Sequence, residues 1–242
     1  MKEIFEQDLF LRGVDNQKIF FIRNKDLRAA VSATNTMQYE DTMQNNKIHD
    51  EVIEMFMKKY SVLPFKFNSI VGERVGRGII VKYYDELQEN LKRIQNKVEY
   101  LVKAIVKESF NKRKLDDLKK IEINRLKFFY DADRTLLKKK ILDVKTKVLS
   151  RQINKMMDEI ASESFVDFLP NDKIILSGEY LVDKRFTDRF NKVLTDLQGL
   201  YPEIEFLSIG PRPPYCFNLI DITKDNTVKL KKIFRRKSDF FN

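Results

Sequence analysis

The stretch from residue 131 to residue 165 contains no proline and no glycine, which constrains the fold more than any other feature of the chain. Because nothing in it breaks a helix and its apolar residues recur near helical spacing, we expect one long helix here. At roughly 1.5 Å per residue this helix would be about 45–50 Å long, so it should project beyond a small sheet. The apolar positions that set the spacing are Leu137, Ile141, Val144, Val148, Ile153, Met156 and Ile160.

The segments on either side of this helix predict a ferredoxin-like sandwich, with the order βαββαβ, for residues 97–222. Alternating patterns at residues 98–106, 173–182 and 205–209 indicate strands, and residues 185–200 indicate a second helix. Continuation of a helix is an alternative for residues 98–106, since that segment carries lysine and glutamate. The expected fold class is α+β.

The first 96 residues predict a separate small α+β domain, which could be a degenerate version of the same sandwich. Short runs rich in β-forming residues occupy positions 4–11 and 18–22, and the turn-like residues between them suggest paired strands. Residues 27–32 form a third candidate strand. We therefore expect two domains, 1–96 and 97–222, followed by a basic tail over residues 223–242.

The rest of the first domain combines two helical patterns with a strand marked by proline. Apolar residues keep helical spacing from His49 to Met57 and again from Ile80 to Val98, so both stretches predict amphipathic helices. Residues 62–67 alternate around Pro64, which cannot donate a ladder hydrogen bond, and this favours an edge strand or a strand start. Between them, three glycines predict a loop: Gly72, Gly76 and Gly78.

Basic residues are concentrated in two places. The whole chain carries 46 Lys and Arg against 36 Asp and Glu, while residues 97–147 hold 16 against 8 and residues 223–242 hold 7 against 2. We interpret most of this excess as solvated helix surface and tail. The alternative is a basic ferredoxin-like module that binds nucleic acid through clusters of phosphate-neutralising residues, although the aromatic RNA-binding signature is not present. These clusters are residues 112–114, 138–140 and 235–237.

A single histidine, His49, and a single cysteine, Cys216, leave little room for catalytic or metal chemistry. A zinc site needs about four such ligands, and a disulfide needs a second cysteine. His49 lies on an apolar helical face, so we expect it to pack or cap, and we expect Cys216 to be a small buried hydrophobic residue. The glycine-rich residues 72–78 match no phosphate loop. No enzyme activity and no catalytic, cofactor or metal residues are expected.

The sequence also bears on location. Its start, MKEIFEQDLFLRG, lacks the apolar stretch and cleavage site of a signal peptide, and nowhere do about 18 uninterrupted apolar residues occur. A single cysteine is natural in a reducing compartment. We expect a cytoplasmic protein without a membrane span.

Two segments are unusual enough to carry identity. They are residues 62–67 (VLPFKF) and residues 210–217 (GPRPPYCF). In the second segment the prolines hold the backbone extended without helical freedom, which places Tyr215 and Phe217 rigidly.

In these segments the chain resembles the GvpL/GvpF family of gas vesicle proteins. The family's closing segment reads approximately G-P-W-P-P-Y-x-F, its middle segment reads V-L-P-x-R-F-G before a helix with Y-D-E-L, and one strand reads A-Y-L-V. Our candidate structural or interaction residues are the positions that match: Val62, Leu63, Pro64, Phe67, Tyr84, Tyr180, Gly210, Pro211, Pro213, Pro214, Tyr215 and Phe217. The chain departs from the pattern at three places, with Arg212 for the usual Trp, Lys66 for an Arg and Asn68 for a Gly.

The resemblance implies an accessory protein of gas vesicle formation, with two largely ferredoxin-like α+β domains. Its implied partners are the small hydrophobic shell protein and other accessory proteins during assembly, and it is implied to associate with the vesicle as a minor component. A soluble partner that covers an exposed apolar surface prevents aggregation before assembly. Edge strands or the apolar helix face of the first domain could provide this cover, by strand addition or by helix-in-groove docking.

Overall fold

The computed structural model describes residues 11–107, 134–168, 173–222 and 228–230. The described residues fall into two compact units. The first contains those of Met1–Glu99 and Arg212–Arg235, and the second contains those of Tyr100–Pro211. The first unit thus extends to Glu99, where we expected a division at residue 96, and residues 212–222 belong to the first unit instead of the second.

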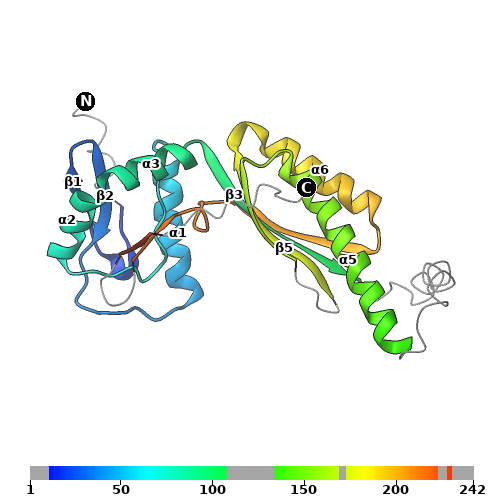
Figure 1. The fold of residues 1–242 in the computed structure, drawn as a ribbon. Helices are drawn as coiled ribbons and strands as arrows, with labels where there is room; N and C mark the ends of the chain where they lie inside the picture. The colour runs from blue at the N-terminus through cyan, green and yellow to red at the C-terminus, as the bar shows by residue number, and fades with distance from the viewer. Residues whose placement is uncertain (1–10, 108–133, 169–172, 223–227, 231–242) are drawn as a thin grey trace. The chain divides into compact units, whose positions relative to one another are not determined.

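The second unit contains a four-stranded sheet with the order β4-β5-β3-β6. Its elements follow one another as β, α, β, β, α, β, so the ferredoxin-like sandwich and the α+β class are confirmed. Helices α5 and α6 lie together on one face of this sheet (Figure 1). In chain order the elements are β3 (Lys97–Val106), α5 (Arg134–Asp158), β4 (Glu163–Asp167), β5 (Ile174–Asp183), η3 (Lys184–Phe186), α6 (Thr187–Leu200) and β6 (Ile204–Arg212).

The core of the second unit lies between the sheet and these helices. Alternate residues of β3 turn toward the helices and are buried, because successive side chains of a strand point to opposite faces. The ring of Phe190 from α6 lies 4.8 Å from that of Tyr100 in β3 and 5.6 Å from that of Tyr180 in β5. Ser150 of α5 donates to the carbonyl of Ile175 at 2.6 Å, which ties the long helix to β5.

The long helix ends earlier than its sequence pattern predicts. We expected residues 131–165, of which 131–133 lie outside the described residues, but α5 ends at Asp158. Residues Glu163–Asp167 form β4 instead and pair antiparallel with β5, with Phe165 opposite Glu179. The apolar spacing continues through this region, but pairing with a neighbouring strand determines its structure.

The described residues of the first unit form a β-hairpin, three α-helices, a short 3-10 helix and a second two-stranded sheet. The two strands expected at residues 18–22 and 27–32 are confirmed and pair antiparallel, with Phe20 opposite Val31. The expected strand at residues 4–11 lies almost entirely outside the described residues. The described elements are η2 (Val14–Asn16), β1 (Ile19–Asn24), β2 (Leu27–Ser32), α1 (Met43–Met57), α2 (Glu73–Lys82), α3 (Tyr84–Ile94), β7 (Ile220–Ile222) and β8 (Val228–Leu230).

This order differs from a degenerate βαββαβ pattern, because three helices in succession follow the hairpin. Their buried residues face the hairpin and one another: the ring of Phe56 from α1 meets that of Phe21 edge-on at 5.8 Å. Of the basic tail expected at residues 223–242, residues 228–230 form β8 and pair with β7, and the remainder lies outside the described residues.

Two local predictions for the first unit are wrong. Residues 62–67 form no strand, because their backbone carbonyls accept hydrogen bonds from side chains instead of from a neighbouring strand. The carbonyl of Pro64 accepts from Asn218, and the carbonyl of Phe65 accepts from His49. The glycine-rich residues 72–78 form the start of α2 and not a loop, since the helix buries Ile79 and Ile80.

Helix α2 packs against β1, and the helix that follows α2 is shorter than expected. A Cβ on Gly76 would make ordinary contact with Val71 at 3.4 Å and with Ile22 at 3.7 Å, so the packing alone does not require glycine at this position. The helix expected at residues 80–98 is interrupted at Tyr83, and α3 ends at Ile94.

Candidate interaction site in the first unit

The carboxyl-terminal motif packs into the first unit, where it meets the proline-marked segment. Phe217 is fully buried, and Asn218 beside it is nearly so. The Asn218 amide donates to the carbonyl of Pro64 at 2.7 Å, while its Oδ1 accepts from the Asn90 amide at 3.3 Å and from the Ile220 backbone at 2.8 Å. The two segments that carry the family resemblance are thus joined through one buried asparagine.

Helix α3 reinforces this junction from a second side. Arg93 donates to the backbone carbonyl of Phe217 and, at 3.0 Å, to Oδ1 of Asn90. Asn90 and Arg93 were missed by the sequence analysis, as was Asn218. Asn90 could have been found, because it lies on the face that buries Leu87 and Ile94, and a buried polar residue on such a face needs a partner.

Arg212 and Glu99 form a second link, which involves the position where the family pattern has Trp. Glu99 is 0% exposed, and its Oε1 accepts two hydrogen bonds from the Arg212 guanidinium, one of them at 2.9 Å. Its Oε2 accepts from the backbone of Cys216 at 2.7 Å. Cys216 is half-buried and lies within 3.9 Å of the same guanidinium, so it is less buried than expected.

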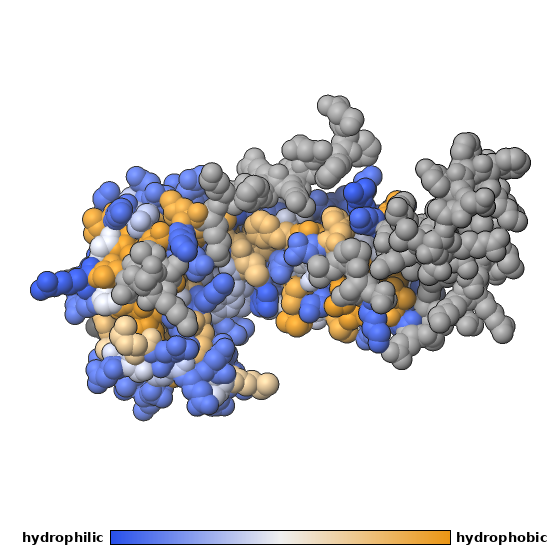
Figure 2. Space-filling model, turned by 60° about the horizontal axis from the view of Figure 1, so that its bottom comes forward, coloured by the Kyte–Doolittle hydropathy of each residue, from blue (hydrophilic) through white to orange (hydrophobic). Residues whose placement is uncertain are grey.

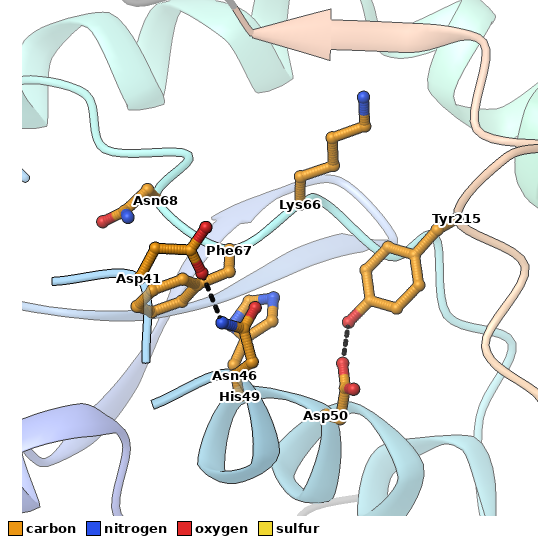
Figure 3. A pocket seen from close by; sticks show the side chains of 8 residues that line it. All are labelled: Asp41, Asn46, His49, Asp50, Lys66, Phe67, Asn68 and Tyr215. Atoms are coloured by element: carbon orange, nitrogen blue, oxygen red, sulfur yellow. Dashed lines mark hydrogen bonds between the residues drawn. The ribbon is translucent and has the colours of Figure 1, made fainter. Parts of the chain in front are cut away.

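A pocket of about 330 Å³ lies beside this junction, within the first unit (Figure 3). It is lined by the amino-terminal half of α1, by the segment that follows Phe65, and by the ring of Tyr215 from the carboxyl-terminal motif. Of the candidate residues, the pocket brings together Phe67 and Tyr215. The full lining is Asp41, Asn46, His49, Asp50, Lys66, Phe67, Asn68 and Tyr215.

His49 and Tyr215 form the aromatic part of the pocket. The His49 ring stacks near that of Tyr215 at 6.4 Å and lies 5.7 Å from that of Phe67. Its Nε2 donates to the carbonyl of Phe65 at 2.9 Å, which confirms the packing role expected for this residue. The Tyr215 hydroxyl donates to Asp50 at 2.6 Å. Burial and then this hydrogen bond raise the pKa of Tyr215, so its hydroxyl stays protonated.

Asn68, which replaces a glycine of the family pattern, keeps the backbone conformation that glycine allows. Its φ is 63°, in the left-handed region that asparagine tolerates better than most residues. Its side chain also accepts from the Tyr39 backbone N–H at 2.8 Å and donates to the Tyr39 carbonyl at 3.0 Å. The replacement therefore preserves the turn and adds a bond to the loop before α1.

The Tyr84 motif forms a separate surface cluster on α3. Tyr84 donates to Asp26 at 2.6 Å, and Gln88 donates to the same carboxylate at 2.7 Å. The ammonium of Lys25 lies 4.0 Å above the Tyr84 ring. The hydrogen bond from Tyr84 is the main cause that lowers the pKa of Asp26. This cluster fixes the end of the hairpin to α3.

The remaining candidate residues do not line the pocket. Pro64, Pro213 and Pro214 are buried around the junction, and Val62 and Leu63 are half-buried. Gly210 and Pro211 are exposed at the end of β6. Tyr180 belongs to the core of the second unit, where its hydroxyl donates to Asn154 at 2.7 Å. The motif positions therefore mark four different places in the fold: the junction with its pocket, the cluster on α3, the end of β6 and the core of the second unit.

The described part of the chain holds no group of three or more His, Cys, Asp or Glu residues placed to bind a metal ion. None of its helices combines the length and the apolar character needed to cross a lipid bilayer. Of the three basic clusters that raised nucleic acid as a partner, residues 112–114 and 235–237 lie outside the described residues. The side chains of residues 138–140 in α5 also lie outside them.

Fold and site together define an α+β protein of two units, one of them ferredoxin-like, in which a proline-rich corner packs into the other unit beside a polar and aromatic pocket. The model of the gas vesicle synthesis protein GvpL/GvpF family matches residues 2–218. The chain belongs to this family, and its role lies in gas vesicle formation.

Individual relatives agree with this assignment. The chain is 24% identical over 227 residues to gas vesicle protein F1 of Halobacterium salinarum, a match that covers 90% of this chain and 91% of that protein. Its fold is similar to the crystal structure of the gas vesicle protein GvpF from Anabaena sp. PCC7120, with a TM-score of 0.70, 17% identity and coverage of 86% and 91%. The GvpF structure from Microcystis aeruginosa gives a TM-score of 0.66 at 16% identity, with the same coverage.

Proposed function

We propose that this protein is a non-enzymatic accessory protein that binds the hydrophobic shell protein during gas vesicle assembly, and that it does so by strand addition at β6. Other accessory proteins of the same assembly are further partners, and the complex persists at the vesicle as a minor component. The observation that carries the proposal is the exposed edge of the second unit's sheet.

Strand β6 is an edge strand whose side chains are unusually apolar for that position. Among the described strands it has β3 as its one neighbour. Leu207 is 45% exposed and Ile209 is 58% exposed, and both lie on the same face because they are two residues apart. Natural edge strands usually carry lysine, proline or a bulge to prevent pairing with another chain. Strand β6 has no lysine, and its one proline, Pro211, lies near its end, beyond Leu207 and Ile209. Apolar residues reach the surface of the second unit among polar ones (Figure 2).

The backbone of β6 shows which of its groups are available. The side chain of Gln198 in α6 donates to the carbonyl of Ile204 at 2.7 Å and accepts from the N–H of Phe206 at 3.2 Å, so it occupies the start of the outer edge. Because backbone groups alternate in direction along a strand, the N–H groups of Ser208 and Gly210 point to the same outer edge as that of Phe206. The Gln198 side chain does not bond to these two residues, so their N–H groups suit an incoming strand.

The shell protein matches this edge in its chemistry. A subunit that exposes apolar surface before assembly needs a soluble partner that covers it. An extended segment paired along β6 would gain main-chain hydrogen bonds, and its alternate apolar side chains would meet Leu207 and Ile209. The proposed surface is thus an edge strand of the second unit. It is neither the proline-marked segment of residues 62–67, which forms no strand, nor the apolar helix face of the first domain.

The experiment is capture of tagged shell protein by the full chain and by its variant Leu207→Thr/Ile209→Thr. Threonine keeps the β-propensity but removes most of the apolar contact, so we expect the affinity to fall about tenfold, or about 1.4 kcal/mol. The matched control is Val148→Gln/Leu200→Gln, which removes two exposed apolar side chains from the helices of the same unit. Equal capture by all three proteins would contradict the proposal.

A nucleic-acid-binding module is the competing function. It predicts retention on polyanion that falls steeply with salt, since counterions return to the phosphates. Capture of shell protein that persists at raised salt, with no retention on polyanion, is the result that our proposal expects.

A further inference from the structure

The pocket of the first unit has no role in the strand addition that we propose at β6. Its lining contains three aromatic rings, those of His49, Phe67 and Tyr215, together with the carboxylates of Asp41 and Asp50 (Figure 3). Two of these rings come from the two segments that carry the family resemblance. Residues far apart in sequence therefore combine into one surface of defined chemistry.

The carboxylates of the pocket are held in place, and each retains an oxygen for a ligand. Asp41 uses Oδ1 to accept from the Asn46 amide at 2.6 Å, and Asp50 uses Oδ1 to accept from Tyr215 at 2.6 Å. No described residue donates to the Oδ2 atom of either carboxylate. Because Tyr215 stays protonated, its hydroxyl donates to Asp50 without adding a charge.

One cation also lines the pocket. Lys66 is exposed, and its ammonium end is directed away from Asp41 and Asp50 (Figure 3). The lining therefore carries two negative charges against one positive charge that is free to remain in solvent. Ring faces together with carboxylates attract a cation, by cation–π contact and by charge-assisted hydrogen bonds.

Arginine fits this combination better than lysine does. The planar guanidinium stacks on aromatic faces and donates from several nitrogens at once, whereas ammonium is a compact and strongly hydrated charge. The volume of about 330 Å³ is at the small end of the range for ligand sites, so it suits one side chain rather than a cofactor.

We propose that this pocket receives an arginine side chain of the partner protein. The inference rests on the proposed function, because it assumes a protein that docks on this chain. It assigns that protein a second point of attachment, in which the guanidinium lies against the rings of His49 and Tyr215 and binds Asp41 and Asp50. Buried arginine side chains of this kind are frequent anchors at protein interfaces.

The test is a titration of the full chain, labelled with ¹⁵N, with N-acetyl-arginine amide. N-acetyl-citrulline amide, which has a similar shape but no charge, is the matched ligand. The test variant is Asp41→Asn/Asp50→Asn, in which asparagine still accepts from Asn46 and Tyr215, so the fold is expected to persist and thermal unfolding checks this. The control variant, Glu89→Gln/Asp196→Asn, changes the net charge equally at exposed positions that do not line the pocket.

We expect arginine amide to shift the backbone resonances of residues 66–68 and 215, and citrulline amide to have a much smaller effect. The test variant should bind at least about fivefold more weakly than wild type, and the control variant should bind as wild type does. Equal shifts with citrulline amide, or unchanged affinity in the test variant, would overturn the inference. The titration involves no partner, so its failure with capture of shell protein intact would leave the proposed function standing. Failure of capture by the wild-type chain would count against the proposed function instead.

Discussion

Glu99 is a buried carboxylate whose partner stands at the position where the family pattern has Trp. Its charge is compensated by the Arg212 guanidinium and by one backbone N–H. A buried charge that loses its partner is strongly destabilising, whereas removal of both charges is often tolerated. The Trp-to-Arg departure in this chain therefore makes sense only together with the glutamate that it binds.

This pairing predicts a strong coupling between the two residues. Arg212→Met should destabilise the first unit by about 3 kcal/mol, because it leaves Glu99 buried without a counter-charge. Arg212→Met/Glu99→Met should recover most of that loss, and urea unfolding of the four proteins of this cycle measures the coupling. Additive effects of the two substitutions would show that the pair does not act as a unit.

The hydrogen bond between Asp26 and Tyr84 predicts a specific dependence on pH. The bond lowers the pKa of Asp26 below its ordinary value of 3.8, so the unfolded chain takes up this proton more readily than the folded one. The stability that the ionised Asp26 carboxylate contributes is thus complete above pH 3.8 and is lost as the pH falls below that value. In urea unfolding, wild type should exceed Asp26→Asn in stability near neutral pH, and the difference should shrink below pH 3.8. A difference that stays constant down to about pH 2.5 would contradict this account.

Single residues were predictable from the sequence where backbone chemistry decides their role. The prolines around Tyr215 and Phe217 predict a rigid corner, and within it Pro213, Pro214 and Phe217 are buried. The partners of the corner were not predictable, because Glu99, Asn90 and Pro64 lie far from it along the chain. Only the fold brings them within hydrogen-bonding distance.

At the scale of elements, the sequence predicted those whose pattern and packing agree. Strands β3, β5 and β6 and helix α6 follow their alternation or helical period closely. The prediction failed at residues 62–67, where side chains replace a neighbouring strand as hydrogen-bond partners, and at residues 72–78, where burial of one helix face outweighs the cost of glycine.

Strand β5 depends on one glycine for its packing. A Cβ on Gly178 would lie 2.9 Å from the ring of Tyr180, which is confined by Phe190 and by the bond to Asn154. Gly178→Ala should therefore destabilise the second unit by about 1–3 kcal/mol, because the ring cannot move without losing these contacts. Thermal unfolding measures the change, and Gly199→Ala, where the Cβ would meet nothing within 4 Å, is the matched control. Equal unfolding temperatures for the two variants would refute the packing argument.

At the scale of the whole molecule, the chain leaves the first unit within β3 and returns to it at Arg212, the last residue of β6. Phe217, Asn218 and the buried prolines complete the first unit although they follow the second in sequence. The sequence could not predict this return, because the composition of residues 212–222 does not show to which unit they belong. The match to the family model, which extends to residue 218, includes this returning segment.

Termination of the chain after Pro211 should consequently damage the first unit, because it removes the returning segment, and spare the second unit, whose described residues it leaves in place. We expect the second unit to keep its dispersed amide resonances, while the first unit loses them, because loss of a buried phenylalanine alone costs about 3–5 kcal/mol. Phe217→Ala in the full chain should reproduce the effect in weaker form. Limited proteolysis followed by mass spectrometry identifies the cleaved unit. Preferential cleavage of the second unit would be the opposite of this expectation.

The central claim, that an extended segment of the shell protein pairs with β6, can be measured by amide hydrogen exchange in the complex. We expect the amides of Ser208 and Gly210 to become protected on binding, because their N–H groups point away from β3 and would donate to the added strand. That of Phe206, which already donates to Gln198, should change little. A complex that forms with no added protection at Ser208 and Gly210 would contradict the claim.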